Sequence, residues 1–179
     1  AGTGIHVEIN LAHYFRKIAE VINTYSRKDN RKHRPIIVFF ENGTRLEEFQ
    51  RSESYRNVKD NTAVHILTEA TPSDSRDFYV KKAGSLGQVT LSTKIFGRGT
   101  DFISRDNNVN ELGGVHVLQT FLSESLSEEV QIKGRTARQG QPGTFSQVLL
   151  LEDAKIKKNN EEVFKKDTLQ YFGLAKIDE

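Results

Sequence analysis

Apolar residues along the chain follow two patterns, one typical of amphipathic helices and one typical of buried strands. Between residues 9 and 25, apolar positions recur at spacings of three and four, which predicts a helix with one buried face. Five short runs of mostly apolar residues, PIIVFF, AVHILT, QVTLST, VHVLQT and FSQVLLLE, predict strands. The first of these runs is apolar at every position, so we expect a strand that is buried on both faces.

Segments with helix signals lie between the predicted strands. ENGTRLEEFQRSESY predicts a turn followed by a helix, which either Asn42 or Thr44 can cap. TPSDSRDFYVKKAG predicts a helix that Thr71 caps, with Pro72 at its first position and Asp74 completing a capping box. SESLSEEVQIKGRTARQ predicts a further helix, whereas we expect FISRDNNVNELGG to be irregular.

The alternation of strands and helices predicts an α/β fold. We expect a mainly parallel sheet with helices on both faces and with ligands at the carboxyl ends of the strands. We divide the chain into an N-terminal helix and basic connector (1–34), a main domain (35–153) and a C-terminal extension (154–179). The basic connector, SRKDNRKHR, is interpreted as a solvated loop rather than a patch that binds nucleic acid.

Composition narrows the class of protein. Hydrophobic residues make up 36% and charged residues 28% of the 179 residues, which excludes an intrinsically disordered chain and is typical of one folded core. The net charge of +2 neither requires nor excludes nucleic acid as a partner. The absence of cysteine excludes disulfides and thiolate metal sites, and the five histidines lack metal-ligand spacing, so we expect no metal site.

Targeting signals and membrane spans are missing from the sequence. No apolar run approaches the ~20 residues that cross a bilayer, and the first ten residues do not resemble a signal peptide. We therefore expect a cytoplasmic protein, whose contact with a membrane would be peripheral. The absence of methionine favours a piece of a longer protein.

Two glycine-rich segments are candidates for chemistry. In the first, Gly97 and Gly99 flank Arg98, and the carboxylate of Asp101 could accept hydrogen bonds from a sugar or cap a turn. In the second, QIKGRTARQGQPG, two arginines three residues apart would lie on the same side of a helix. Guanidinium groups bind phosphate through paired hydrogen bonds, although an exposed helix with incidental arginines explains this spacing better when it is taken alone.

The order of the motifs resembles one known family. The blocks GRGTD (97–101), GGVHV (113–117), GRTARQGQPG (134–143) and LLLED (149–153) closely resemble the second RecA-like motor domain of the SecA family. SecA proteins are ATPases of protein translocation and belong with the superfamily-two helicases. The resemblance covers residues 35–153 and implies a RecA-like three-layer sandwich, which is the helicase C-terminal domain.

In that family, this domain closes over ATP that is bound to a first motor domain. The resemblance implies that Arg135 and Arg138 reach the γ-phosphate as arginine fingers. It also implies that four further residues line the nucleotide cleft, namely Arg98, Gly99, Asp101 and Gln131. The implied cofactor is ATP with Mg, bound mainly by a first RecA-like motor domain of the same protein. Unfolded polypeptide and a translocation channel are the other implied partners.

The chain lacks two motifs that bind ATP and its magnesium ion. It contains no G-x-x-x-x-G-K-[ST] phosphate loop, and no Asp-Glu pair follows a predicted buried strand. It therefore supplies half of an ATP site, and we expect the isolated chain to show no appreciable ATPase activity.

Two other functions remain open from the sequence. The chain could be the C-terminal domain of an RNA or DNA helicase, although the acidic SESLSEE segment and the near-neutral charge argue against nucleic acid. It could also be a degenerate domain that serves as an interaction module. Lys94 and Phe96 favour this second alternative because the SecA family usually has other residues at these positions.

Overall fold

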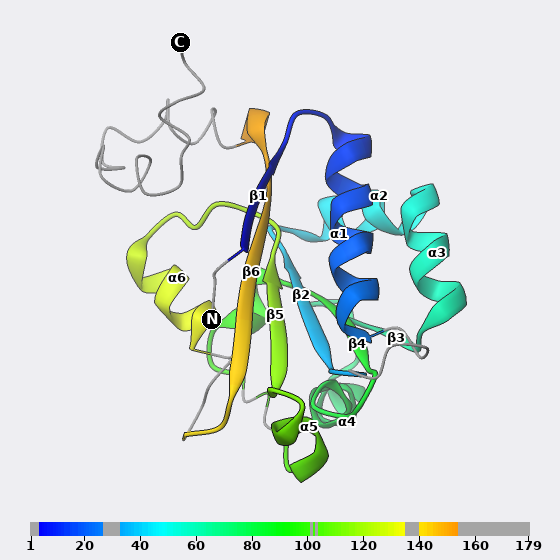
Figure 1. Cartoon of the computed structure of the whole chain (residues 1–179). Coiled ribbons are helices and arrows are strands. Elements are labelled where there is room, and N and C mark those ends of the chain that lie inside the picture. Colours follow the sequence, from blue (N-terminus) through cyan, green and yellow to red (C-terminus); the bar gives the residue numbers. More distant parts are fainter. Residues whose placement is uncertain (1–3, 27–32, 101, 103, 135–139, 154–179) are drawn as a thin grey trace.

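Six parallel strands form one sheet in the computed structural model, which describes residues 4–26, 33–100, 102, 104–134 and 140–153 (Figure 1). Each neighbouring pair of strands in the sheet is parallel. Across the sheet the strands follow the order β1 (Gly4–Glu8), β6 (Gly143–Leu150), β5 (Val115–Gln119), β2 (Ile36–Phe40), β4 (Val89–Thr93) and β3 (Val64–Leu67). The predicted α/β fold with a parallel sheet is thus confirmed.

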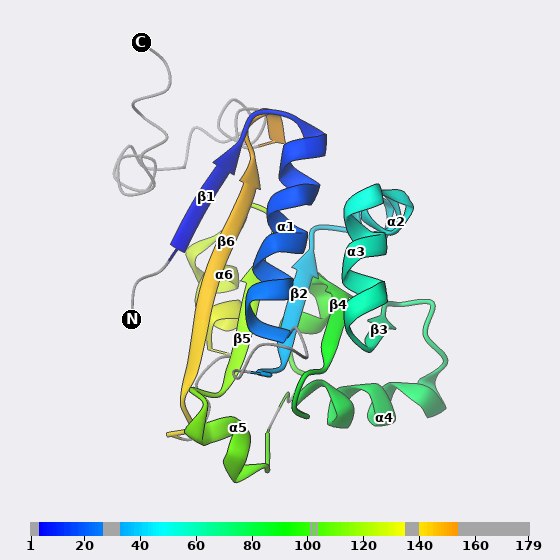
Figure 2. The ribbon, with the colours of Figure 1, turned by 45° about the vertical axis from the view of Figure 1, so that its right-hand side comes forward.

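Helices cover both faces of the sheet and bury two apolar cores. On one face lie α1 (Leu11–Ser26), α2 (Gly43–Arg51) and α3 (Glu53–Asn61), whereas α4 (Ser73–Ala83) and α6 (Leu126–Lys133) contribute to the core of the other face. Figure 2 shows α1 and α3 in front of the sheet and α6 behind it. Side chains of β2 alternate between the two cores, with Val38 in one and Phe39 in the other, and both are fully buried. This explains why the PIIVFF run is apolar throughout.

The first strand, β1, was not predicted from the sequence. It is an edge strand of five residues that are all only partly buried, and it pairs with β6 from the opposite end of the described chain. Its burial depends on β6 and on α1, so the short segment carries little signal of its own. The strand and α1 pack with the same sheet as the main domain, and where a domain boundary falls in the whole protein stays a prediction.

Two segments that lie between the strands need correction. ENGTRLEEFQRSESY forms two helices, because Ser52 adopts an extended backbone and its hydroxyl bonds to both, donating to the Phe49 carbonyl (2.6 Å) and accepting from the Tyr55 amide (3.3 Å). Asn42 is the side chain that caps α2, as one of the two alternatives predicted. Within FISRDNNVNELGG, the segment Asn107–Glu111 is a short helix, α5, capped by Asp106.

The predicted cap of α4 is wrong. The helix begins at Ser73, its N-cap is Pro72, and no side chain caps it, so Thr71 and Asp74 form no capping box. The hydroxyl of Thr71 instead accepts a hydrogen bond from the Thr68 amide (3.0 Å) and so ties the turn that follows β3. The hydroxyl of Thr71 bonds within the turn after β3, so it is not used to cap α4 as its local sequence predicted.

The last residue of the basic connector, Arg34, is buried. Arg34 is 6% exposed, and its guanidinium donates to the carbonyl oxygens of Gly114 and Gly113 (both 2.8 Å) and to the Thr144 hydroxyl (2.7 Å). The interpretation of the connector as a solvated loop is therefore wrong for Arg34, while residues 27–32 lie outside the described residues. Arg34 joins the end of α1 to the starts of β5 and β6.

His116 lies beside this arginine as a buried, neutral imidazole. Its Nδ1 atom is 2.7 Å from the Thr144 hydroxyl, its Nε2 atom is 2.8 Å from the Ser146 hydroxyl, and its ring stacks on Tyr25 with centroids 3.7 Å apart. Thr144 already accepts a hydrogen bond from Arg34, so its own proton is free to be donated to Nδ1 of a neutral ring. Burial, and secondarily the charge of Arg34, lower the pKa of His116 to about 3.

We expect His116 to lower the stability of the fold at mildly acidic pH, above the pH range in which carboxylates titrate. Between the unfolded pKa of 6.5 and the folded pKa of about 3, the unfolded chain binds a proton that the folded chain excludes. The stability due to this site is therefore complete above pH 6.5 and falls as the pH is lowered. Between pH 7 and 5, His116→Gln should lose about 2 kcal/mol less free energy of unfolding than the parent chain. Urea unfolding at several pH values measures this, and parallel pH profiles for both proteins would contradict it.

Candidate functional site

A glycine turn follows β4 at the carboxyl end of the sheet. β4 continues into a 3-10 helix, η1 (Lys94–Gly97), which Arg98 ends. Gly99 follows with a φ of 74°, a left-handed conformation that favours glycine, and apart from its chain neighbours no atom of the described residues lies within 4 Å of where its Cβ would be. Arg98 and Gly99 are both exposed. The turn therefore presents a cation and an accessible backbone at the edge where parallel sheets bind ligands.

Helix α6 packs closely against this turn. A Cβ atom on Gly97 would lie 2.9 Å from Cγ1 of Ile132, so the glycine permits the close approach. Ile132 is fully buried and belongs to the same core as Phe39 and Phe121. The sequence motif G-R-G is thus partly a packing motif, which places η1 directly beside α6.

The start of α6 is held by a polar network at the end of β5. The Gln119 amide donates to the Phe121 carbonyl and to the Ser123 hydroxyl (both 2.7 Å), which fixes the loop between β5 and α6. Ser125 caps the helix, because its hydroxyl accepts a hydrogen bond from the Glu128 amide (3.2 Å). These bonds set the position of α6 relative to the sheet.

Two ion pairs connect η1 and its following turn to α6 and the loop before it. Lys94 Nζ lies 3.3 Å from a carboxylate oxygen of Glu124, and Arg98 Nη2 lies 3.0 Å from Oε2 of Glu128. The partners in each pair are 30 residues apart in sequence. Lys94 and Glu124 are partly exposed, whereas Glu128 is only 2% exposed.

Three of the six residues predicted to bind the nucleotide lie in the described chain, and they gather at this contact. Arg98 and Gly99 lie on the turn, and exposed Gln131 lies one helical turn beyond Glu128, on the same side of α6. Asp101, Arg135 and Arg138 lie outside the described residues. The roles assigned to all six residues stay predictions.

Sequence reasoning missed Glu128 as a member of this site. A glutamate three residues after a serine is the usual signal of a capping box, so its type and position indicated only a helix start. Its contact with Arg98 could not be predicted, because the two residues are 30 positions apart in the sequence and only the fold brings them together.

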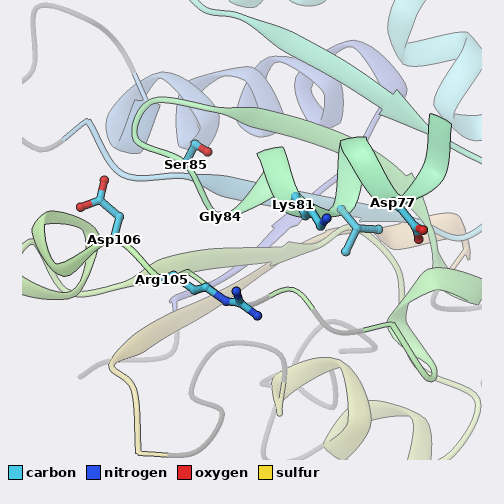
Figure 3. A pocket seen from close by; sticks show the side chains of 7 residues that line it. Asp77, Lys81, Gly84, Ser85, Arg105 and Asp106 are labelled. Atoms are coloured by element: carbon cyan, nitrogen blue, oxygen red, sulfur yellow. The ribbon is translucent and has the colours of Figure 1, made fainter. Parts of the chain in front are cut away.

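A large hollow among the described residues lies elsewhere. It has a volume of about 730 Å³ and lies beside the end of α4 and the loop that leads to α5 (Figure 3). Its lining includes two carboxylates and two cations, Asp77, Lys81, Arg105 and Asp106. The opposite charges balance, and the hollow lies near the amino end of β4 rather than at the glycine turn. We assign it no role.

Neither a metal site nor a membrane span is found in the described part of the chain. No group of three or more histidine, aspartate or glutamate side chains there could hold a metal ion. None of the described helices is both long and apolar enough to cross a bilayer.

Known proteins resemble this chain in sequence. The family model of the SecA P-loop domain matches residues 102–176, which includes the α6 region and most of the predicted C-terminal extension. Protein translocase subunit SecA 2 of Bacillus cereus is 35% identical over 141 residues, 79% of this chain and 17% of the relative. Protein translocase subunit SecA of Campylobacter lari is 36% identical over 141 residues, 78% of this chain and 15% of the relative. The chain therefore spans about a sixth of the length of these relatives.

Solved structures resemble the chain in fold. Domain 2 of the DEAD-box helicase Mss116p, solved bound to an RNA duplex, superposes with a TM-score of 0.61 at 21% identity. The match covers 83% of this chain and 53% of the other. This likeness confirms the RecA-like fold predicted from the motifs.

Proposed function

We propose that this chain, a SecA-like domain of the superfamily-two helicase type, is the second motor domain of an ATP-driven protein translocase. The observation that carries the proposal is the contrast between two likenesses. The chain shares 35% identity with a SecA protein over 141 residues, but only 21% with a DEAD-box helicase of the same fold. Fold alone does not imply function, so the higher sequence identity to a SecA protein supports polypeptide over nucleic acid as the substrate.

The proposed chemistry needs a partner domain. Arg98, Gly99, Asp101 and Gln131 would line the cleft, and Arg135 and Arg138 would reach the γ-phosphate of ATP held by a first motor domain. The exposed guanidinium of Arg98 and the open backbone at Gly99 fit a phosphate group. Magnesium would be bound mainly by the first motor domain, as the resemblance to the SecA family implies.

The charges near the carboxyl edge of the sheet support polypeptide rather than nucleic acid as the substrate. Three cations there are paired with carboxylates. Lys94 pairs with Glu124, Arg98 pairs with Glu128, and Arg45 pairs with both Glu48 and Asp153 (3.0 Å each). A surface that binds nucleic acid needs unpaired cations to displace counterions from phosphates. These three pairs reduce the positive charge that the described residues of this edge offer to a phosphate backbone.

ATP turnover with different stimulants tests the proposal. The 179-residue chain alone should hydrolyse no ATP above background, because half of the site is missing. A protein that joins this chain to a first motor domain should hydrolyse ATP faster with unfolded polypeptide and no faster with single-stranded RNA or DNA. Stimulation by nucleic acid alone would favour the helicase alternative. The absence of turnover with an intact first domain would favour the degenerate interaction module.

A further inference from the structure

Glu128 is an unusual carboxylate. Among the described residues it is the only acidic side chain that is almost fully buried, at 2% exposure. Its Oε2 atom accepts a hydrogen bond from Arg98, and its Oε1 atom has no hydrogen-bond partner in the described part of the chain. Burying a carboxylate with one oxygen unpaired is costly, so the residue needs an explanation beyond helix stability.

Local structure does not supply that explanation. In a complete capping box, the glutamate at the third helical position would reach back to the backbone of the capping serine. Only half of this arrangement is present, because the Ser125 hydroxyl accepts from the Glu128 amide while the Glu128 carboxylate turns to Arg98. The side chain is therefore committed to a residue outside its own helix.

Arg98 has the complementary arrangement. Its side chain is 59% exposed, and it bonds to Glu128 through Nη2 alone. Its Nε and Nη1 atoms make no hydrogen bond to the described residues, so donors of the same planar group remain for another ligand. The backbone on both sides is set, because Gly97 packs on Ile132 and Gly99 holds a left-handed conformation.

We propose that Glu128 is a positioning residue that anchors one end of the Arg98 guanidinium, so that its free donors face a phosphate oxygen of the nucleotide. A free arginine side chain loses rotational freedom when it binds an anion, and an anchored one has already lost it. The anchor lies on α6, which ends at Lys133, two residues before Arg135 in the sequence. The ion pair thus joins the turn after β4 to the helix that leads to the predicted arginine fingers. This inference rests on the proposed function.

Side-chain NMR on the 179-residue chain tests the anchor itself. In the parent chain, rotation of the Arg98 guanidinium should be slow enough to separate its Nη signals. In Glu128→Leu these signals should merge, whereas the control Glu47→Gln, which alters an exposed pair with Arg51, should leave them separate. The urea midpoint of Glu128→Leu should stay the same or rise, because the change removes a buried carboxylate whose Oε1 atom has no partner among the described residues. A large loss of stability would assign Glu128 a purely structural role, and unchanged Arg98 signals would also overturn the proposal.

ATP turnover separates the failure of this inference from the failure of the proposed function. In a protein that includes a first motor domain, Glu128→Leu should lower kcat for ATP between about 10-fold and 100-fold. Glu47→Gln should leave kcat unchanged. If the parent protein turns over ATP and Glu128→Leu does so equally well, the positioning role is wrong. If the parent protein has no turnover, the proposed function is wrong, and the NMR result alone decides whether Glu128 anchors Arg98.

Discussion

Arg138→Ala is expected to reduce kcat for ATP hydrolysis by about 10³-fold or more in a protein that carries this domain together with a first motor domain. The proposed reason is that an arginine supplied across an interface stabilises the charge that develops on the transferred phosphoryl group. The same substitution at Arg135 should have an effect of similar size. Steady-state turnover with saturating ATP and magnesium measures both.

Two further variants make this expectation specific. Arg138→Lys keeps the positive charge but loses the planar pair of donors, so it should restore little of the activity. Arg51→Ala removes an exposed arginine of α2 that pairs only with Glu47 among the described residues, and it should not change kcat. Turnover of Arg135→Ala and Arg138→Ala within a factor of two of the parent protein would contradict the assignment of both arginines as fingers.

Gly114→Ala is expected to have the largest effect on stability, a loss of about 3 to 5 kcal/mol in free energy of unfolding. Gly114 has a φ of 80°, and a Cβ atom there would lie 1.7 Å from the carbonyl oxygen of Pro142. That oxygen belongs to the backbone, so a rotation of a side chain cannot relieve the overlap. The start of β5 or of β6 would have to move, together with the hydrogen bond from Arg34 to the Gly114 carbonyl.

Gly87→Ala is the matched control, since Gly87 has a φ of 68° but, apart from its chain neighbours, no described residue has an atom within 4 Å of the added Cβ. It should lose only the conformational cost of a left-handed alanine, about 1 to 2 kcal/mol. Urea unfolding of the three proteins measures the difference. Equal losses at the two positions would show that backbone conformation, and not the contact with Pro142, determines the requirement for glycine.

The parts of the fold that were predicted correctly are those with strong local patterns. β2 is a continuous apolar run because the sheet buries both of its faces, β4 and β5 mix apolar with polar buried residues, and α1 has apolar residues at helical spacing because one face packs on the sheet. The elements that were missed or misplaced depend on distant partners. β1 forms because it pairs with β6. The hydroxyl of Thr71 bonds within the turn that follows β3 and does not cap α4 as predicted.

In the candidate site too, features with a local sequence pattern were predicted and contacts between distant residues were not. The glycines and arginines of the two motifs were evident because their residue types and order are unusual. The burial of Arg34 against Gly113 and Gly114, and the pairing of Arg98 with Glu128, were not evident. These partners are separated by 30 to 80 residues, so their types carry no mutual signal in a single sequence.

The sequence by itself determined that this chain is an α/β domain with SecA-like motifs and without a phosphate loop, because periodicity and motif order are properties of the chain. Only the tertiary structure decided which charges meet. It placed Arg98 on a turn that a close glycine contact brings against α6, and it buried the carboxylate of Glu128 beneath that arginine. The physical reason is that ion pairs depend on distances in space, which parallel crossovers create between segments far apart in the chain.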